Sequence, residues 1–209
     1  MTELVFIMDR SGSMCGREED VVGGFNSVLN QQKKEQNEGY VTSVLFNDTH
    51  QIVVDRVSFD SVKPMEVKEF MCSGCTAMYD AIGFTVDHIS KIHKYIKKED
   101  VPEKTIVVIT TDGLENASRE YSRQSVKRLI EQKKEEGWQF LFLAANMDAA
   151  EAGEAVGIDE EYSVNYHNDA RGTSKLFRAV NRFVQASICG EGSSSVWREE
   201  LDEDYTCRS

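Results

Sequence analysis

Continuous apolar runs alternate along the chain with segments in which apolar residues recur every three or four positions. Runs such as 104–111 and 139–145 are typical of buried parallel strands. The repeating segments, for example Val21, Val22 and Phe25, are typical of amphipathic helices. We expect strands at 4–8, 40–46, 50–57, 104–111, 139–145 and 161–165. We expect helices at 18–37, from just after 76 to about 98, from 122 or 125 to 137, and at 148–156 and 173–188.

This alternation predicts an α/β fold. A turn at Asn47-Asp48 joins the second and third predicted strands into a hairpin, so one antiparallel edge strand is expected. The other strands alternate with helices, which indicates right-handed crossovers and a doubly wound, mostly parallel, six-stranded sheet. A length of 209 residues with 40% hydrophobic content suits one domain with a substantial core.

The composition changes after residue 189. Residues 190–195 resemble a linker, and residues 198–209 are polar and acidic with little to bury. We therefore predict a domain at 1–189 and a flexible acidic tail at 190–209. Trp197 is then either an anchor for a partner or part of a segment without fixed structure.

Candidate chemistry begins where the first strand ends. Asp9 closes the apolar run, and Ser11 and Ser13 follow at alternate positions, so the three side chains can converge in a loop. Thr76 precedes the second long helix, and Asp112 closes the strand at 104–111. Ligands gather beyond the carboxyl ends of parallel strands, and carboxylate and hydroxyl oxygens suit Mg²⁺, Mn²⁺ or Ca²⁺. The pattern predicts one shared cation site.

These five positions resemble the metal-ion-dependent adhesion site of von Willebrand factor A domains. That site has an Asp-x-Ser-x-Ser loop, here residues 9–13, with Thr76 in a second loop and Asp112 in a third. The resemblance covers residues 3–188, and residues 74–82 look like the bacterial and phage branch of the family. It implies a Rossmann-like sheet with strand order 3-2-1-4-5-6, in which the strands ending at Asp9 and Asp112 are central neighbours.

The resemblance also implies a function. Ser11 and Ser13 would bind Mg²⁺ directly, Thr76 would join them in the ligand-engaged state, and Asp9 and Asp112 would act through water. Mn²⁺ or Ca²⁺ could replace Mg²⁺. A Glu or Asp of a partner protein would complete the metal's coordination. The expected activity is therefore divalent-cation-dependent protein binding and not catalysis.

Other interpretations remain open. Asp9, Ser11 and Ser13 are also common turn and helix-cap residues. The same site could serve a metal-dependent hydrolase or phosphatase, or the fold could be a metal-free scaffold. The sequence has no Walker A loop, no Gly-x-Ser-x-Gly elbow and only four histidines, which disfavours an enzyme.

The net charge of −12 argues against a nucleic-acid partner. No leader peptide or membrane-spanning stretch is visible, so we expect a cytoplasmic protein without membrane contact. Residues 199–204 of the acidic tail could offer a carboxylate to a neighbouring molecule's metal, which would produce self-association.

Five cysteines suit reduced thiols better than a disulfide framework. Cys72 and Cys75 form a C-x-x-C just before Thr76, and Cys15 follows Ser13 by two residues. A zinc or redox site here would need a fourth ligand that the sequence does not supply. We therefore expect these three cysteines to be small, semi-buried residues without a metal role.

Overall fold

The computed structural model describes residues 1–190 and 195–208. Its centre is a six-stranded sheet in the order β3-β2-β1-β4-β5-β6, in which only the β2–β3 pair is antiparallel. The strands are β1 Thr2–Asp9, β2 Gly39–Phe46, β3 His50–Ser58, β4 Lys104–Thr111, β5 Gln139–Ala144 and β6 Ser163–Asn165. The predicted fold class, strand order and antiparallel edge are confirmed.

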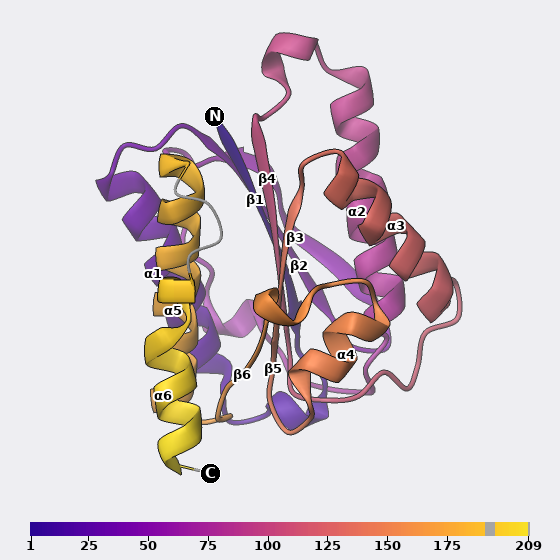
Figure 1. The fold of residues 1–209 in the computed structure, drawn as a ribbon, viewed down its shortest axis with the longest axis vertical. Helices are drawn as coiled ribbons and strands as arrows, with labels where there is room; N and C mark the ends of the chain where they lie inside the picture. Colours follow the sequence, from indigo (N-terminus) through magenta and orange to yellow (C-terminus); the bar gives the residue numbers. More distant parts are fainter. Residues whose placement is uncertain (191–194, 209) are drawn as a thin grey trace.

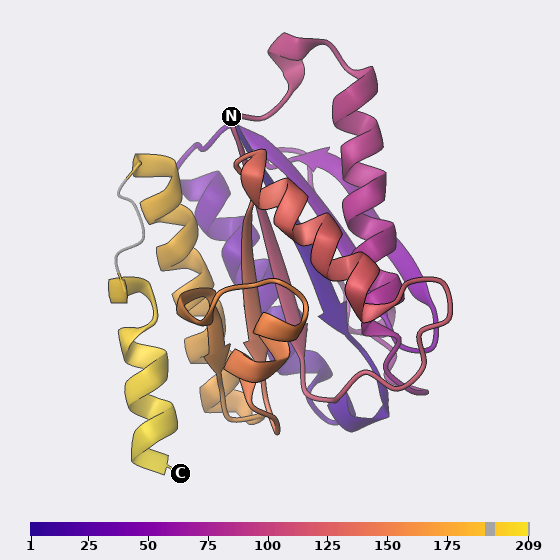
Figure 2. The ribbon, with the colours of Figure 1, turned by 45° about the vertical axis from the view of Figure 1, so that its right-hand side comes forward.

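Helices cover both faces of the sheet (Figures 1 and 2). The helices α1, α5 and α6 lie on one face, and α2, α3 and α4 lie on the other. Their bounds are α1 Glu18–Lys34, α2 Met78–Tyr95, α3 Arg123–Glu135, α4 Ala149–Ala155, α5 Ala170–Cys189 and α6 Glu199–Arg208. The helix α5 begins before the predicted Thr173, because Asp169 caps it by accepting the Gly172 N–H at 2.8 Å.

The central strand β1 explains why an apolar run ends at an aspartate. Leu4, Phe6 and Met8 pack on the α1 and α5 side, whereas Val5 and Ile7 pack on the α2 side. All eight residues of β1 are buried, because both faces of the sheet are covered. The strand therefore delivers Asp9 to the carboxyl edge of the sheet.

Register places the ends of β1 and β4 side by side. Met8 pairs with Thr110 in the parallel β1–β4 ladder, so Asp9 lies next to Thr111. Asp112 follows directly at the same edge. The strand order thus brings the first and third predicted loops together at the point where the sheet's winding reverses.

The expectation that residues 198–209 have little to bury is wrong for α6, and Trp197 just before this helix is buried as well. Trp197 is 4% exposed, and its ring lies 5.3 Å from that of Phe183, edge to face. Leu201 is 1% exposed. Trp197 and Leu201 are four residues apart in the sequence, and both pack against the core. This spacing is hard to recognise because the residues around them are polar.

Ion pairs also hold α6 to the domain. The buried carboxylate of Asp204 pairs with Arg171, Lys175 and Arg208, and Glu200 pairs with Arg178 and Arg182. Residues 191–194 of the predicted linker lie outside the described residues. Self-association through residues 199–204 stays a prediction.

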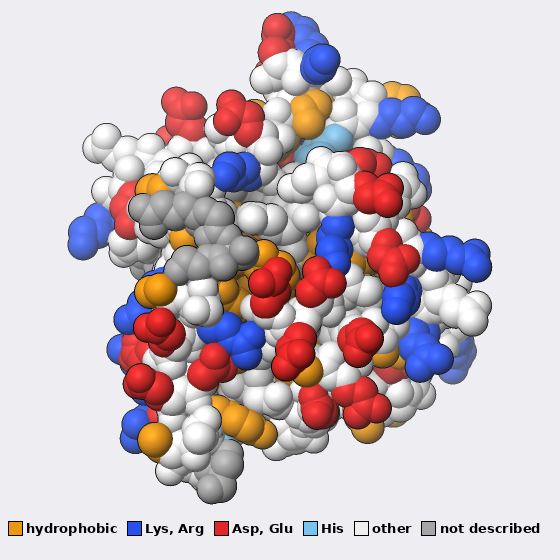
Figure 3. Space-filling model, viewed as in Figure 1, with side chains coloured by type: hydrophobic (Ala, Val, Ile, Leu, Met, Phe, Trp, Pro, Cys, Tyr) orange, Lys and Arg blue, Asp and Glu red, His pale blue; other side chains and the backbone are white. Residues whose placement is uncertain are grey.

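Among the described residues, no helix has the length and apolar character needed to cross a bilayer. The surface seen in Figure 3 carries many Asp and Glu side chains across its lower centre. This distribution agrees with the strongly negative net charge.

Truncating Leu201 tests the packing of α6. Leu201→Ala removes a fully buried side chain, so the free energy of unfolding should fall by about 2–5 kcal/mol. Glu203→Ala, on the exposed side of the same helix, is the matched control and should change it by less than about 0.5 kcal/mol. Urea denaturation measures both, and equal small effects would show that α6 does not pack on the domain in solution.

Candidate metal site

The first loop turns sharply after β1. The Ser11 N–H donates to Asp9 Oδ1 at 2.7 Å, and a short 3₁₀ turn, Gly12–Met14, follows. The hydroxyls of Ser11 and Ser13 lie 3.1 Å apart. Asp9 and Ser11 are buried, whereas Ser13 is exposed. The alternate positions therefore converge as the sequence predicts.

The third loop joins the first through side chains. The Ser13 hydroxyl donates to Asp112 Oδ1 at 2.5 Å, and the Thr111 hydroxyl lies 2.7 Å from Asp9 Oδ2. Asn168, in the loop after β6, donates to Asp112 Oδ2 at 2.7 Å. Each carboxylate oxygen of both aspartates thus accepts a hydrogen bond.

The second loop brings Thr76 to the same place. A Cβ added at Gly113 would lie 3.2 Å from Thr76 Oγ1 and 3.7 Å from Ser13 Oγ, so both hydroxyls border Gly113. Asn116 fixes Thr76 from the third loop: its side-chain oxygen accepts the Thr76 N–H at 2.9 Å, and its own N–H donates to the Thr76 carbonyl at 3.0 Å.

Backbone hydrogen bonds tie the second loop to the first. The Ser73 N–H donates to the Arg10 carbonyl at 3.0 Å, and the Gly12 N–H donates to the Gly74 carbonyl at 3.1 Å. Gly74 has a φ of +75°, and a Cβ there would collide with the Asp48 carboxylate at 1.9 Å. Glycine is therefore required for this close approach.

The structure brings all five predicted ligands together, although their role as ligands stays a prediction. Sequence reasoning missed Thr111 and Asn168, which hydrogen-bond the two aspartates. The adjacency of Thr111 to Asp112 at a strand end was a usable signal. Asn168 gave none, because its contact depends on how the loop after a three-residue strand returns to the sheet.

Acids outside the five residues hold the third loop in place. Asp80, in the first turn of α2, accepts the N–H groups of Arg119, Glu120 and Tyr121 at 2.7–2.9 Å. Glu115 accepts the Tyr79 N–H at 2.9 Å. Asp80 therefore ties the start of α2 to the loop that follows Asp112.

Burial governs the electrostatics of the two aspartates. Desolvation raises the pKa of Asp9 above its usual value, and the nearby charge of Asp112 adds to this effect. Desolvation likewise raises the pKa of Asp112, against hydrogen bonds from Ser13 and Asn168 that lower it. No Lys, Arg or His of the described residues forms an ion pair with either group. A cation at this position would relieve the unfavourable burial of both charges.

The donor geometry fits a hard divalent cation. Neighbouring ligands around an octahedral Mg²⁺ with bonds of about 2.1 Å are about 3.0 Å apart. The hydroxyl oxygens of Ser11 and Ser13 are separated by 3.1 Å. Because Ser13 donates its only proton to Asp112, its contact with Ser11 is a hydrogen bond from the Ser11 hydroxyl, which occupies one Ser13 lone pair and leaves the other for a cation. Both serines can therefore serve as adjacent ligands without a change of rotamer.

The histidines have other partners among the described residues. The ring of His50 lies against that of Phe84 at a tilt of 30°, with centroids 4.0 Å apart. His88 hydrogen-bonds Asp55, His93 hydrogen-bonds Glu3, and His167 Nε2 lies 3.2 Å from the Tyr205 carbonyl oxygen. None of these contacts joins an imidazole to one of the five predicted ligands.

Comparison with known proteins supports the fold. No family model matches the sequence, and no curated protein matches it significantly. Among solved structures, the vWF domain of the type V pili tip protein Mfa5 from Porphyromonas gingivalis has a TM-score of 0.62 at 9% identity, over 88% of this chain and 96% of that one. Manganese-loaded TRAP from Plasmodium vivax has a TM-score of 0.59 at 16% identity, over 85% and 73%.

Proximal thread matrix protein 1 from the mussel byssus also matches, with a TM-score of 0.58 at 16% identity over 88% of this chain. This chain spans only 45% of that protein. Together with a VWA domain from Catenulispora acidiphila, these neighbours show that the chain has the fold of von Willebrand factor type A domains. The assignment to the bacterial or phage branch stays a prediction.

Replacing Asp9 by Asn tests the electrostatic cost of the site. Because the pKa of Asp9 is raised in the folded state, the native protein binds this proton more tightly than the unfolded chain. Its stability therefore falls as the pH rises from the ordinary pKa of aspartate through the raised one. Asp9→Asn removes that loss and can keep the hydrogen bonds to Ser11 and Thr111.

The metal-free Asp9→Asn variant should consequently melt a few degrees above the wild type at neutral pH, and this gap should close in acid. Thermal melts from acid to neutral pH in the presence of EDTA measure both effects. Asp55→Asn, at an exposed carboxylate on β3, is the control and should not show this gain. A variant that melts below the wild type at neutral pH would contradict the account.

Proposed function

We propose that this protein is a divalent-cation-dependent protein-binding module whose Mg²⁺ accepts a Glu or Asp carboxylate from a partner. The observation that carries the proposal is the convergence of three loops on the Ser11 and Ser13 hydroxyls, with two buried aspartates behind them. The VWA fold supports the coarser assignment to a protein-interaction or adhesion module. Mn²⁺ or Ca²⁺ could occupy the same site.

The ligand set favours a carboxylate from outside. Hydroxyl ligands are neutral, so the charge of the cation is balanced only by Asp9 and Asp112, both of which are already hydrogen-bonded. Such a cation stays electrophilic and would bind a further anionic oxygen strongly. The exposure of Ser13 leaves a route for that oxygen from solvent.

The negative net charge of the protein makes binding of an acidic partner depend on the cation. A protein with a charge of −12 repels an acidic partner at long range. Attraction between the two then depends on the local 2+ charge of the metal. We therefore propose that binding is lost on metal removal and strengthens when moderate salt screens the repulsion.

We propose a binding role rather than catalysis, because metal-dependent hydrolysis needs a base near the metal-bound water. The side chains that hydrogen-bond the five predicted ligands are hydroxyls, two amides and hydrogen-bonded carboxylates. The five cysteines are free, which suits the cytoplasmic location that we propose.

Ser13→Ala should weaken cation binding. It removes one candidate ligand and leaves Asp112 Oδ1 without its hydroxyl donor. We expect the affinity for Mn²⁺ to fall about tenfold or more, equivalent to about 1.4 kcal/mol. Loss of the free Mn²⁺ signal in electron paramagnetic resonance measures it. Ser61→Ala, at an exposed serine far along the chain, is the control; equal affinities in both variants would contradict the assignment of Ser13.

Partner capture tests the function itself. Wild-type protein immobilised as bait should retain a partner in Mg²⁺ and release it in EDTA, and Thr76→Ala should lose this partner. Thr105→Ala, a buried threonine at the opposite end of β4, should behave as the wild type. Replacing the acidic residues of the captured partner by amides, one at a time, should identify one that abolishes binding. Retention that is insensitive to EDTA would indicate a metal-free scaffold instead.

A further inference from the structure

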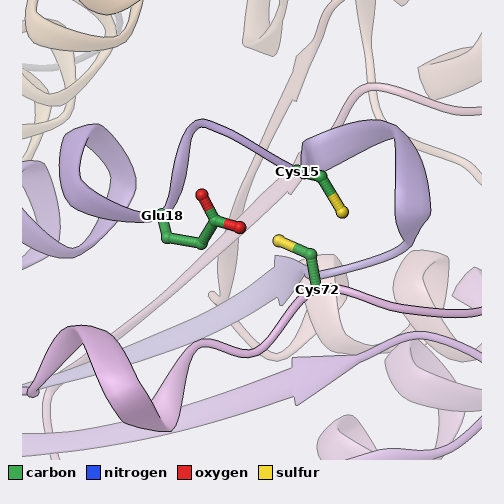
Figure 4. A group of neighbouring side chains, drawn as sticks. All are labelled: Cys15, Glu18 and Cys72. Carbon is green, nitrogen blue, oxygen red and sulfur yellow. The ribbon is translucent and has the colours of Figure 1, made fainter.

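A second group of ligand atoms lies beside the candidate metal site. The sulfurs of Cys15 and Cys72 and a carboxylate oxygen of Glu18 all lie within 4.8 Å of one another. Figure 4 shows the three side chains pointing toward one another from different segments. Cys15 follows the 3₁₀ turn that carries Ser13, Glu18 opens α1, and Cys72 precedes the loop that carries Thr76.

In the structure Cys72 lies next to Cys15, which differs from the pair that the sequence spacing suggests. The C-x-x-C motif associates Cys72 with Cys75, but Cys75 is not part of the group. The backbone turns at Gly74, which has a positive φ, and the Cys75 N–H then donates to Asp48 at 3.0 Å. Cys15 takes its place because the segment before Thr76 runs alongside the first loop.

The group is organised before any ion arrives. The Gly16 N–H donates to a carboxylate oxygen of Glu18 at 2.8 Å, which orients that side chain. Cys15 is exposed and Cys72 is half-buried, so both sulfurs are held near the surface. A surface hollow lined by Gly16, Glu18, Phe70, Met71 and Cys72 opens onto the group. Water can reach a fourth coordination position through this hollow.

The ligand chemistry is that of zinc. In a tetrahedral site with Zn–S bonds of about 2.3 Å, two sulfurs are about 3.8 Å apart, so the 4.8 Å limit here demands a movement of no more than about 1 Å. Thiolates are soft ligands that select Zn²⁺ over Mg²⁺, whereas the Ser11 and Ser13 hydroxyls are hard ligands. The two neighbouring groups of ligand atoms would therefore favour different cations.

We propose that Cys15, Glu18 and Cys72 bind a thiophilic divalent cation of the Zn²⁺ type, with water as fourth ligand. Each thiol releases its proton to solvent as the metal binds. The ion links the loop of Ser13 to the segment of Thr76, adding a coordination bridge to the two backbone hydrogen bonds between them. This site does not depend on the proposed function of the Mg²⁺ site.

Cobalt titration tests the proposal on the reduced, full-length protein in excess Mg²⁺. Coordination of Co²⁺ by thiolates produces charge-transfer absorption that hydroxyl and carboxylate ligands cannot produce. One equivalent of Co²⁺ should give this absorption in the wild type, and one equivalent of Zn²⁺ should abolish it. Cys15→Ser and Cys72→Ser should lose the absorption, and Glu18→Gln should weaken Co²⁺ binding.

Two control variants separate this site from its neighbours. Cys75→Ser, at the exposed cysteine of the same motif, should keep the full absorption. Asp9→Asn should also keep it, even where Mn²⁺ binding at the other site is lost. A wild type without the absorption, or an equal signal in all variants, would overturn the proposal.

Alkylation of the wild type provides a readout that requires no variant. Zn²⁺ should slow iodoacetamide modification of Cys15 and Cys72, measured by peptide mass, and leave Cys75 and Cys207 unprotected. Equal rates with and without Zn²⁺ would overturn the proposal. A further outcome would also overturn it: the reduced protein shows no cobalt absorption, and Cys15 and Cys72 readily form a disulfide in air. The two cysteines would then be a redox pair and not metal ligands.

Discussion

Two carboxylates buried at the ends of adjacent central strands are the constraint around which this structure is arranged. Asp9 is 0% exposed and Asp112 is 4% exposed, and neither forms an ion pair with a basic side chain of the described residues. Burying like charges together is unfavourable, and hydrogen bonds from Ser11, Ser13, Thr111 and Asn168 offset only part of that cost. A bound cation would complete the balance. The other deeply buried carboxylates, Glu3 and Asp204, already pair with basic side chains, so the unpaired Asp9 and Asp112 mark the candidate site.

The loops at this edge depend on one another. The first and second are joined by backbone hydrogen bonds, and the second and third by the reciprocal pair between Thr76 and Asn116. Such connections hold the candidate ligand oxygens in place, which would lower the cost of ordering them around an ion. The same proximity creates the Cys15, Glu18 and Cys72 group, so hard and soft ligands lie next to each other on one pair of loops.

The pattern of apolar positions was sufficient for the strands and for α1 to α5, and parallel topology placed Asp9 and Asp112 at the same edge of the sheet. The strand order that makes their strands neighbours came from the family resemblance. Thr76 could be proposed from its place in a loop before a helix, and the family resemblance supported that choice. Asn168 and the pairing of Cys72 with Cys15 depend on loop paths that no local pattern encodes. The helix α6 was missed because its composition is acidic, while its packing depends on Trp197, Leu201 and the ion-paired Asp204.

The most direct test of the central claim is a crystal structure of the protein with Mn²⁺, in which anomalous diffraction locates the ion. The account predicts one strong peak within coordination distance of the Ser11 and Ser13 hydroxyls, with Asp9 and Asp112 nearby and a further ligand position facing solvent. If crystals at saturating Mn²⁺ show no anomalous peak between these loops, or show the ion bound elsewhere, the proposed metal site is contradicted.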